Sequence, residues 1–361
     1  MNVQEGNNIK NVLDVLWKIP QILEEKRVFL LLIDGLGINT PNFPKKLKCE
    51  KFRTVFPSST PTFFYSFHSG REPKKHGYLE WYMRFKDEII TIPPWKRVSG
   101  EDLILDVDVK PKDIFPFKPF FKKIREKGKE VLHVTPYADT YFTLFSMQGC
   151  EIMEISSLSE IFPIPEDKDL IYVYWPNVDM ILHQQYKGIA YEMEISFIET
   201  FVEFLLKKLP KNMELIITSD HGLVKTSKVF ELPIVDDVLP VGGARVAFYR
   251  DVEKEKVEKM FKKKKIKAEI KSIFEIPDYG RNISKRCVEN FGDVVAIAKG
   301  KASFNYPYRK LILEMLGLSE GETSHAALEN EAEVGVHGGL SEEELYVNLW
   351  TTMEIEELLG D

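Results

Sequence analysis

Residues 28–35 read Val-Phe-Leu-Leu-Leu-Ile-Asp-Gly, an unbroken apolar run that ends at an Asp-Gly turn. A short apolar run bounded by a turn signal is typical of a strand buried on both faces of a sheet. The pattern recurs at residues 170–174 and 215–218, and residues 189–209 between them have the apolar spacing of a long helix. Strands that alternate with helices predict an α/β fold with a largely parallel sheet and helices on both faces.

The sequence changes character after residue 240. Segment 240–308 contains two expected strands and a charged helix, at 246–249, 294–299 and 252–265. We interpret this segment as a small α+β insertion in a core formed by residues 1–239 and 309–361. The charged helix carries four consecutive lysines at 262–265, which we interpret as a solvated helix face, with an anion-binding patch as the alternative.

Composition excludes several classes of protein. The chain has 361 residues, of which 44% are hydrophobic, so it can bury a core and is neither disordered nor a small disulfide scaffold. Its net charge of −7 predicts no binding to long nucleic acid. Cys49, Cys150 and Cys287 lie far apart and in no metal-binding spacing, which favours reduced thiols and a cytoplasmic protein. Residues 1–10 are polar and no apolar run approaches about 20 residues, so we expect neither a signal peptide nor a membrane span.

A set of acidic, histidine and hydroxyl residues recurs near the ends of the expected strands. It comprises Asp34, Thr60, Asp179, His183, Asp220, His221 and His337. Each residue alone also fits a structural role, such as a turn, a local salt bridge or a loop histidine. Together, the six Asp and His side chains are the ligands that Zn²⁺ or Mn²⁺ accepts, and three ligands per ion would make a two-metal site.

A nucleophile for such a site is offered by residues 58–60, Ser-Ser-Thr, which precede an expected helix at 63–70. A hydroxyl at a helix N-terminus lies near free N–H groups and the positive end of the helix dipole, which suits attack on phosphorus. Helix capping explains a hydroxyl there equally well. The local pattern leaves Ser58, Ser59 and Thr60 open as the nucleophile.

The order of the motifs resembles the alkaline phosphatase superfamily, and most of all its type I phosphodiesterase/nucleotide pyrophosphatase branch. The resemblance covers almost the whole chain, from residue 28 to about 347. The matching motifs are Leu-Ile-Asp-Gly at 32–35, Phe-Pro-Ser-Ser-Thr at 56–60, Ser-Gly-Arg-Glu-Pro-Lys-Lys-His-Gly at 69–77, Asp-x-x-x-His at 179–183, Ser-Asp-His-Gly at 219–222 and Val-His-Gly-Gly at 336–339. The resemblance implies a three-layer α/β/α sandwich with a mostly parallel central sheet.

The resemblance also implies a role for each site residue. One metal would be held by Asp34, Asp220 and His221, and the other by Asp179, His183 and His337. Thr60 would be the nucleophile, would bridge to the metal held by Asp34, and would form a phosphothreonine intermediate. The ions implied are two divalent metals, Zn²⁺ with Mn²⁺ as the alternative, and the reaction is hydrolysis of small, nucleotide-like phosphodiesters. His325 competes with His337 for the last ligand position.

One departure keeps other reactions open. Nucleotide pyrophosphatases of this branch carry an Asn shortly after the His-Gly motif, whereas residues 78–82 here read Tyr-Leu-Glu-Trp-Tyr. The alternatives are a phosphomonoesterase, a phosphonate hydrolase, a phosphomutase or a non-catalytic relative that binds metal or phosphate. A dinucleotide-binding oxidoreductase is set aside because no complete Gly-x-Gly-x-x-Gly follows the first strand. Nearby aromatic residues could stack on a nucleobase or belong to the core, namely Phe63, Phe64, Trp81, Tyr82 and Trp175.

Overall fold

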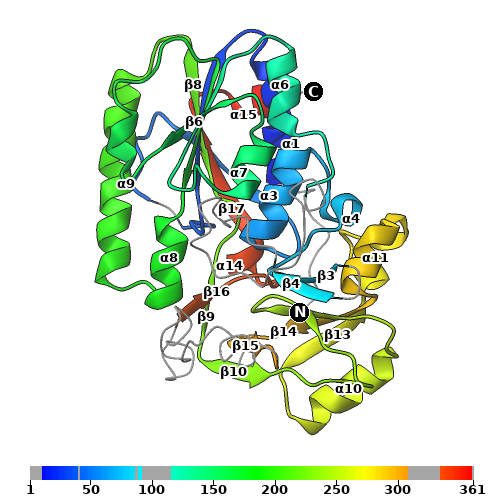
Figure 1. Ribbon diagram of the computed structural model, residues 1–361. Coiled ribbons are helices and arrows are strands. Elements are labelled where there is room, and N and C mark those ends of the chain that lie inside the picture. Colours follow the sequence, from blue (N-terminus) through cyan, green and yellow to red (C-terminus); the bar gives the residue numbers. More distant parts are fainter. Residues whose placement is uncertain (1–9, 40, 86–87, 92–114, 308–333, 360–361) are drawn as a thin grey trace.

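A computed structural model describes residues 10–39, 41–85, 88–91, 115–307 and 334–359, and within them the chain forms a central sheet and a second, smaller region built on another sheet (Figure 1). The central sheet has seven strands in the order β2-β17-β8-β1-β7-β5-β6. Their bounds are β1 (Arg27–Ile33), β2 (Lys48–Arg53), β5 (Val131–Thr135), β6 (Glu151–Glu154), β7 (Leu170–Trp175), β8 (Met213–Thr218) and β17 (Tyr346–Thr351).

Strand β1 shows why the apolar run at 28–33 folds as predicted. It pairs in parallel with β7 on one side and β8 on the other, so residues 28–33 have no contact with water. Successive side chains of a strand point to opposite faces. Val28, Leu30 and Leu32 therefore enter one hydrophobic cluster, and the alternate residues enter a second cluster on the other face. Five of the strands are parallel to their neighbours in this way, whereas β17 is antiparallel to both β8 and β2.

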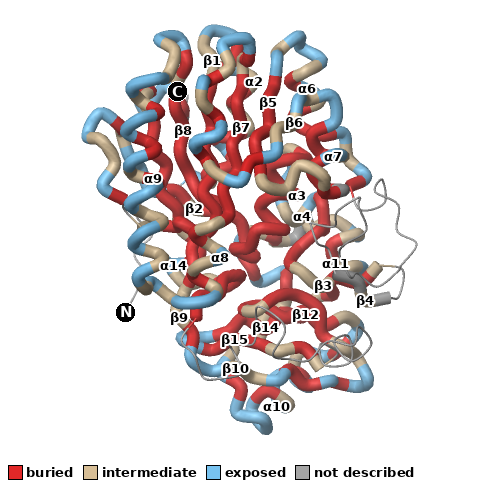
Figure 2. Tube along the Cα trace, turned by 60° about the vertical axis from the view of Figure 1, so that its left-hand side comes forward, coloured by how far each residue is buried: buried red, intermediate tan, exposed pale blue. Residues whose placement is uncertain are grey.

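Helices cover both faces of the central sheet, as the α/β prediction requires (Figure 1). One face carries α8 (Asn177–Gln184) and α9 (Ile189–Lys208), and the 3-10 turn η1 (Leu158–Ile161) packs in the same cluster. The other carries α1 (Val12–Leu16), α2 (Ile19–Ile22), α3 (Thr60–Ser69), α6 (Phe120–Glu126), α7 (Tyr141–Ser146) and α15 (Ile355–Leu359). Figure 2 shows the inner strands of this sheet as buried segments, with exposure on the outer helices and loops, and the edge strands β2 and β6 are also partly exposed.

The second sheet has six strands in the order β13-β14-β12-β11-β3-β4. Strands β12 (Val246–Tyr249) and β14 (Val294–Ala298) lie where the sequence predicts them, with β11 (Val241–Gly242) and β13 (Ala268–Ser272) as neighbours. Strands β3 (Tyr82–Phe85) and β4 (Glu88–Thr91) join the same sheet, although they come from the stretch assigned to the core. The boundary of the predicted insertion at 240–308 stays a prediction.

The charged helix of this region is α10 (Lys254–Lys263), which buries Val257 and Phe261 against the second sheet. Lysines 262–265 are all exposed, as a solvated helix face requires. The remaining helices are α4 (Pro73–His76), α11 (Lys285–Phe291) and α14 (Glu342–Leu345), with two 3-10 turns, η2 (Ile273–Glu275) and η3 (Gly280–Asn282). Two small strand pairs complete the described elements. They are β10 (Lys228–Glu231) with β15 (Ala302–Asn305), and β9 (Val224–Thr226) with β16 (Val334–Val336). No helix in the described ranges combines the length and apolarity that a bilayer span needs.

Candidate metal centre

The candidate site lies at the carboxyl ends of three neighbouring parallel strands. Asp34 directly follows β1, Asp220 comes two residues after β8, and Asp179 lies in the first turn of α8, which follows β7. Carboxyl ends of parallel strands meet at one edge of the sheet, which is where ligands bind in open α/β folds. The backbone N–H of Asp179 donates to the Asp34 carbonyl at 3.1 Å, so these two segments are joined directly.

His337 reaches the site through the small antiparallel ladder of β9 and β16. Strand β9 begins two residues after Gly222, and Val336 pairs with Val224 across the ladder. The next residue, His337, stacks its ring on that of His221, with 4.0 Å between the ring centroids. His183, one turn after Asp179 on α8, lies with its ring centroid 5.1 Å from that of His337.

Thr60 is the first residue of α3, and this helix begins three residues earlier than predicted. The predicted start at 63 is wrong, because the helix includes Pro61. Proline is tolerated in a first helical turn, where its missing N–H has no partner to lose. The Thr60 hydroxyl lies 3.0 Å from His221 Nε2 and donates to Asp34 Oδ2 at 3.4 Å.

The two neighbouring hydroxyls have other partners. Ser58 donates to the Gly339 carbonyl at 2.9 Å, and Ser59 Oγ lies 2.9 Å from Thr62 Oγ1. Of the three hydroxyls that the sequence left open, Thr60 is therefore the one that contacts the predicted ligands in the described structure.

Two groups of side chains have donor atoms close enough to share an ion, with all atoms of a group within 4.8 Å of one another. The first group, Asp179, His183 and His337, is one of the two predicted ligand sets. The second group contains Asp34, His221 and again Asp179. Asp220, predicted in that set, lies beside it, with Oδ2 3.4 Å from His221 Nε2. The two groups thus adjoin at Asp179.

The donor atoms fit divalent cations. Asp34 Oδ1, Asp179 Oδ1 and Asp220 Oδ2 are buried and have no hydrogen-bond partner among the described residues. Buried polar atoms are almost always hydrogen-bonded, so three unbonded carboxylate oxygens in one place need another partner. Carboxylate oxygens and imidazole nitrogens suit Zn²⁺ and Mn²⁺, which would satisfy those oxygens.

The electrostatics of the carboxylates agree with a cation partner. Burial raises the pKa of Asp34 well above its ordinary value, and the charges of Asp220 and Asp179 raise it further. Burial likewise raises the pKa of Asp220. Burial alone would also raise the pKa of Asp179. The charges of the neighbouring histidines, of which His183 has the largest effect, outweigh burial and hold this pKa below its ordinary value. A divalent ion would stabilise the ionised form of all three carboxyl groups.

Tyr174 is a site residue that the sequence analysis missed. Its hydroxyl donates to Asp34 Oδ2, and the side chain is buried beside the Asp34 carboxylate. Residues 172 and 174 are both tyrosines in a strand that is otherwise apolar, which was the available signal. Asp220 is oriented in a similar way, since its Oδ1 accepts from the backbone N–H groups of Gly35 and His221 at 3.2 and 3.0 Å.

The stacking hypothesis is wrong for three of the five aromatic residues. Phe63, Phe64 and Trp175 are at most 3% exposed and belong to the hydrophobic clusters, whereas Trp81 and Tyr82 are partly exposed. His325, the competitor of His337, lies outside the described residues.

The family model of type I phosphodiesterase / nucleotide pyrophosphatase matches residues 32–339 of this chain. The chain belongs to this family. As a member of this family, the chain is a phosphoryl-transfer hydrolase. The family is metal-dependent in general, and this chain has residues that could hold a metal ion. Curated protein sequences gave no match.

Solved structures show that the family fold is shared at low sequence identity. Murine ectonucleotide pyrophosphatase / phosphodiesterase 5 is 17% identical, with a TM-score of 0.63 and coverage of 90% of this chain and 88% of that one. An inactive form of that protein in complex with AMP gives the same values. Phosphonoacetate hydrolase from Sinorhizobium meliloti in complex with phosphonoacetate is 16% identical, with a TM-score of 0.55 and coverage of 91% and 90%.

Proposed function

We propose that this protein hydrolyses phosphodiester bonds in small, nucleotide-like substrates, with Thr60 as the nucleophile and two divalent metal ions as cofactors. The observation that carries the proposal is the position of the Thr60 hydroxyl. It lies at the N-terminus of α3, 3.0 Å from His221 Nε2 and 3.4 Å from Asp34 Oδ2, which are two residues of one predicted ligand set. A small substrate agrees with the AMP complex of the murine structural neighbour.

In this mechanism the Thr60 oxygen attacks phosphorus and the bond from phosphorus to the leaving oxygen breaks. The Thr60 hydroxyl donates to Asp34 Oδ2 at 3.4 Å, so its proton has an acceptor when the oxygen attacks. When bound, the divalent ions supply positive charge that lowers the pKa of the hydroxyl and neutralises the phosphoryl oxygens. Free N–H groups in the first turn of α3 favour negative charge at the same place. Water then hydrolyses the phosphothreonine and restores Thr60.

The ligand set supports Zn²⁺, with Mn²⁺ as the alternative, because both accept mixed carboxylate and imidazole ligands. We further propose a cytoplasmic location, no membrane partner and no long nucleic acid as substrate. The net charge of −7 supports the last of these, since binding along a nucleic acid backbone depends on cationic side chains.

Hydrolysis of a phosphonate is the second candidate. It is favoured by the absence of an Asn at residues 78–82 and by the phosphonoacetate hydrolase among the structural neighbours. Phosphomonoester hydrolysis and phosphate transfer by a mutase use the same predicted ligands and differ in how the substrate charge is held.

The test is turnover of the metal-loaded protein on bis-p-nitrophenyl phosphate, p-nitrophenyl phosphate and phosphonoacetate. The proposal expects faster cleavage of the diester than of the monoester. Preference for the monoester or for phosphonoacetate would replace it with the corresponding alternative, and no turnover of any of the three with two ions bound would contradict it.

The nucleophile is tested by Thr60→Ala, with Thr60→Ser as its matched control. Thr60→Ala should reduce kcat at least about 10³-fold while metal content and the unfolding midpoint stay at wild-type values, because the covalent step needs the hydroxyl. Thr60→Ser keeps a hydroxyl and should retain measurable turnover. Wild-type activity in Thr60→Ala would instead assign the attack to another oxygen.

A further inference from the structure

Glu80 combines two features that each lower the stability of a folded chain. Its side chain is fully buried, and neither carboxyl oxygen has a hydrogen-bond partner within the described residues. Its backbone has a φ of +59°, in the left-handed region that residues other than glycine rarely adopt. Burial raises the pKa of this carboxyl to about 8, because it disfavours the charged form. Stability alone therefore does not account for a glutamate at this position.

The Glu80 carboxyl is enclosed by two glycines from distant parts of the chain. A Cβ atom added at Gly243 would lie 2.1 Å from Oε2, and one added at Gly338 would lie 2.5 Å from Oε1. Both distances are far below van der Waals contact, so the carboxyl fits only because both residues lack side chains. Gly338 directly follows His337, and Gly243 directly follows β11 of the second sheet.

The same residue is attached to the turn that carries Thr60. The Glu80 N–H donates to Thr62 Oγ1 at 3.2 Å, and Thr62 Oγ1 lies 2.9 Å from the hydroxyl of Ser59, the residue that precedes α3. Ser58, in the same turn, donates to the Gly339 carbonyl at 2.9 Å. The turn at 57–60 and the loop at 337–339 therefore meet. Glu80 lies against the loop at Gly338 and is linked to the turn through Thr62.

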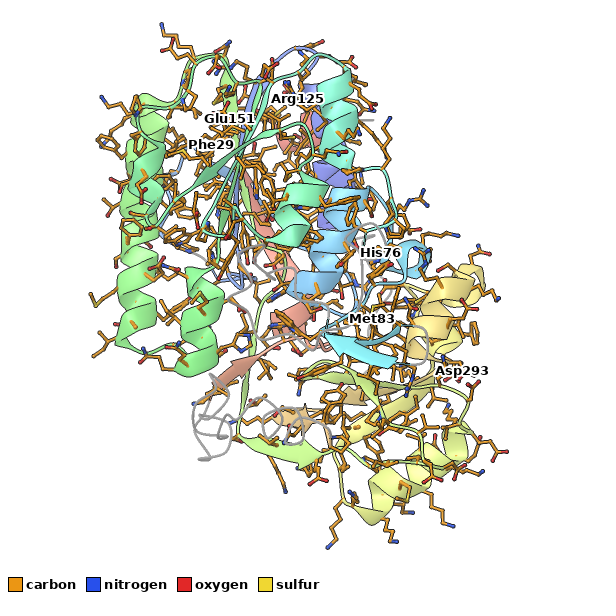
Figure 3. All side chains as sticks on the ribbon, viewed as in Figure 1. Phe29, His76, Met83, Arg125, Glu151 and Asp293 are labelled. Atoms are coloured by element: carbon orange, nitrogen blue, oxygen red, sulfur yellow. The ribbon has the colours of Figure 1, made fainter. Side chains whose placement is uncertain are left out.

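Glu80 also lies on the segment that links the two parts of the molecule. The chain passes from α4 to β3 between His76 and Met83, both labelled in Figure 3. On its other side, the loop at 337–339 is held by Glu344, which accepts from the Gly339 N–H at 2.8 Å and pairs with Arg245. Glu344 thus has hydrogen-bond partners, and the described structure gives the Glu80 carboxyl none.

We infer that Glu80 is a positioning residue, whose carboxyl sets the separation between the turn that carries Thr60 and the loop that carries His337. The inference rests on the proposed function, in which Thr60 and His337 must act on the same phosphoryl group. The carboxyl also lies against Gly243, which follows β11 of the second sheet. A shift of that sheet would therefore move the carboxyl and change the distance between the turn that carries Thr60 and the loop that carries His337. The chain thus keeps a buried carboxyl and a strained backbone because they place two parts of the site relative to each other.

The first test compares Glu80→Gln with Glu80→Met, which have similar lengths. Glu80→Met removes the polar atoms and should leave the unfolding midpoint unchanged or higher, while kcat falls about 10- to 100-fold with little change in KM. It should also weaken binding of one of the two metal ions, measured by titration of the metal-free protein with Zn²⁺ or Mn²⁺. Glu80→Gln keeps the shape and polarity and should retain most of the wild-type kcat and both metal affinities.

The second test moves the carboxyl from the opposite side. Gly243→Ala places a methyl group against Glu80 Oε2 without altering either segment of the site, and it should lower kcat. In the Glu80→Ala background the same change should have no further effect, because the carboxyl that it displaces is gone. Additive losses of kcat in the double variant would overturn the inference.

The two proposals fail in different ways. If the wild-type protein turns over a test ester and Glu80→Met matches it in kcat and in both metal affinities, the positioning role is wrong and the proposed function stands. A lower unfolding midpoint in Glu80→Met with unchanged kcat would assign Glu80 to stability alone, which also overturns the inference. If the wild-type protein turns over nothing but Glu80→Met still weakens one metal ion, the proposed function fails and the positioning role stands.

Discussion

Asp34 receives two hydrogen bonds on one carboxylate oxygen and none on the other. Thr60 and Tyr174 both donate to Oδ2, whereas Oδ1 is buried without a hydrogen-bond partner among the described residues. Donors on one oxygen fix the orientation of the carboxylate and leave the other oxygen available to a cation. Residues that orient a metal ligand in this way tune affinity almost as strongly as the ligands themselves.

Tyr174→Phe should therefore weaken metal binding about 10- to 100-fold with little loss of stability, because one hydroxyl is removed and the ring is kept. The measurement is titration of the metal-free protein with Zn²⁺. Tyr172→Phe is the matched control, since this tyrosine lies two residues away in the same strand and its hydroxyl lies 3.4 Å from His68 Nε2 instead. Equal metal affinities in the two variants would rule out an orienting role for Tyr174.

At the scale of the element, the predictable parts are those with a local signal. Strands β1, β7 and β8 are apolar runs ended by turns, and the acidic residues that follow them could be assigned to one edge of a sheet. Strand β2 has no such signal, because its sequence Lys-Cys-Glu-Lys-Phe-Arg is mostly exposed and is held by pairing with β17 almost 300 residues later. Tyr174 and Glu80 could not be assigned because their roles come from side chains that only the tertiary fold brings near them.

The turn after β8 gives an element-scale prediction. A Cβ atom at Gly222 would lie 2.1 Å from the backbone carbonyl of Glu343 and 3.0 Å from the Cα of Gly37, so neither neighbour can move cheaply. Gly222→Ala should lower the free energy of unfolding by about 2–3 kcal/mol and disturb His221, one residue before it.

The measurement for Gly222→Ala is chemical unfolding together with metal content. Gly188→Ala is the control, because the atom nearest to its added Cβ is the flexible end of the Gln185 side chain, at 3.1 Å. A Gly222→Ala protein with wild-type stability and two bound ions would show that the turn can shift without cost.

At the scale of the whole molecule, three buried histidines couple folding to pH. Burial lowers the pKa of His76 to about 3 and that of His133 to about 4, and lowers the pKa of His68 well below its ordinary value of 6.5. All three lie in the core, with His68 on α3, His76 at the end of α4 and His133 on β5. The rings of His68 and His76 lie 2.8 and 2.9 Å from serine hydroxyls. They are neutral in the folded chain at neutral pH. In the unfolded chain they take up protons at a higher pH than they do in the folded chain.

The sign of the pH dependence follows from these shifts. The folded-state pKa of each histidine is below its unfolded value. Above about pH 6.5 each histidine is neutral in both states, so it does not change the free energy of unfolding. As the pH drops from there toward 4 and 3, only the unfolded chain takes up protons, and the free energy of unfolding falls. Each histidine should contribute a slope of about 1.4 kcal/mol per pH unit in that window.

His133→Asn tests this coupling, because the asparagine amide can replace the hydrogen bond from Nδ1 to the Tyr172 carbonyl without titrating. Urea unfolding of the metal-free protein at several pH values between 4.5 and 7 should give a shallower slope for this variant, by about the contribution of one proton. Other titrating groups are common to both proteins and cancel in the comparison. Identical slopes would contradict a neutral, buried His133.

The position of β17 has a consequence for synthesis of the chain on the ribosome. This strand lies between β8 and β2 in the central sheet, although it is the last strand described, and His337 precedes it by only nine residues. A nascent chain that ends before this stretch lacks a predicted ligand as well as the strand that holds β2 in place. We therefore expect every shorter translation product to be inactive, so that hydrolysis begins only after the polypeptide has been made beyond Thr351.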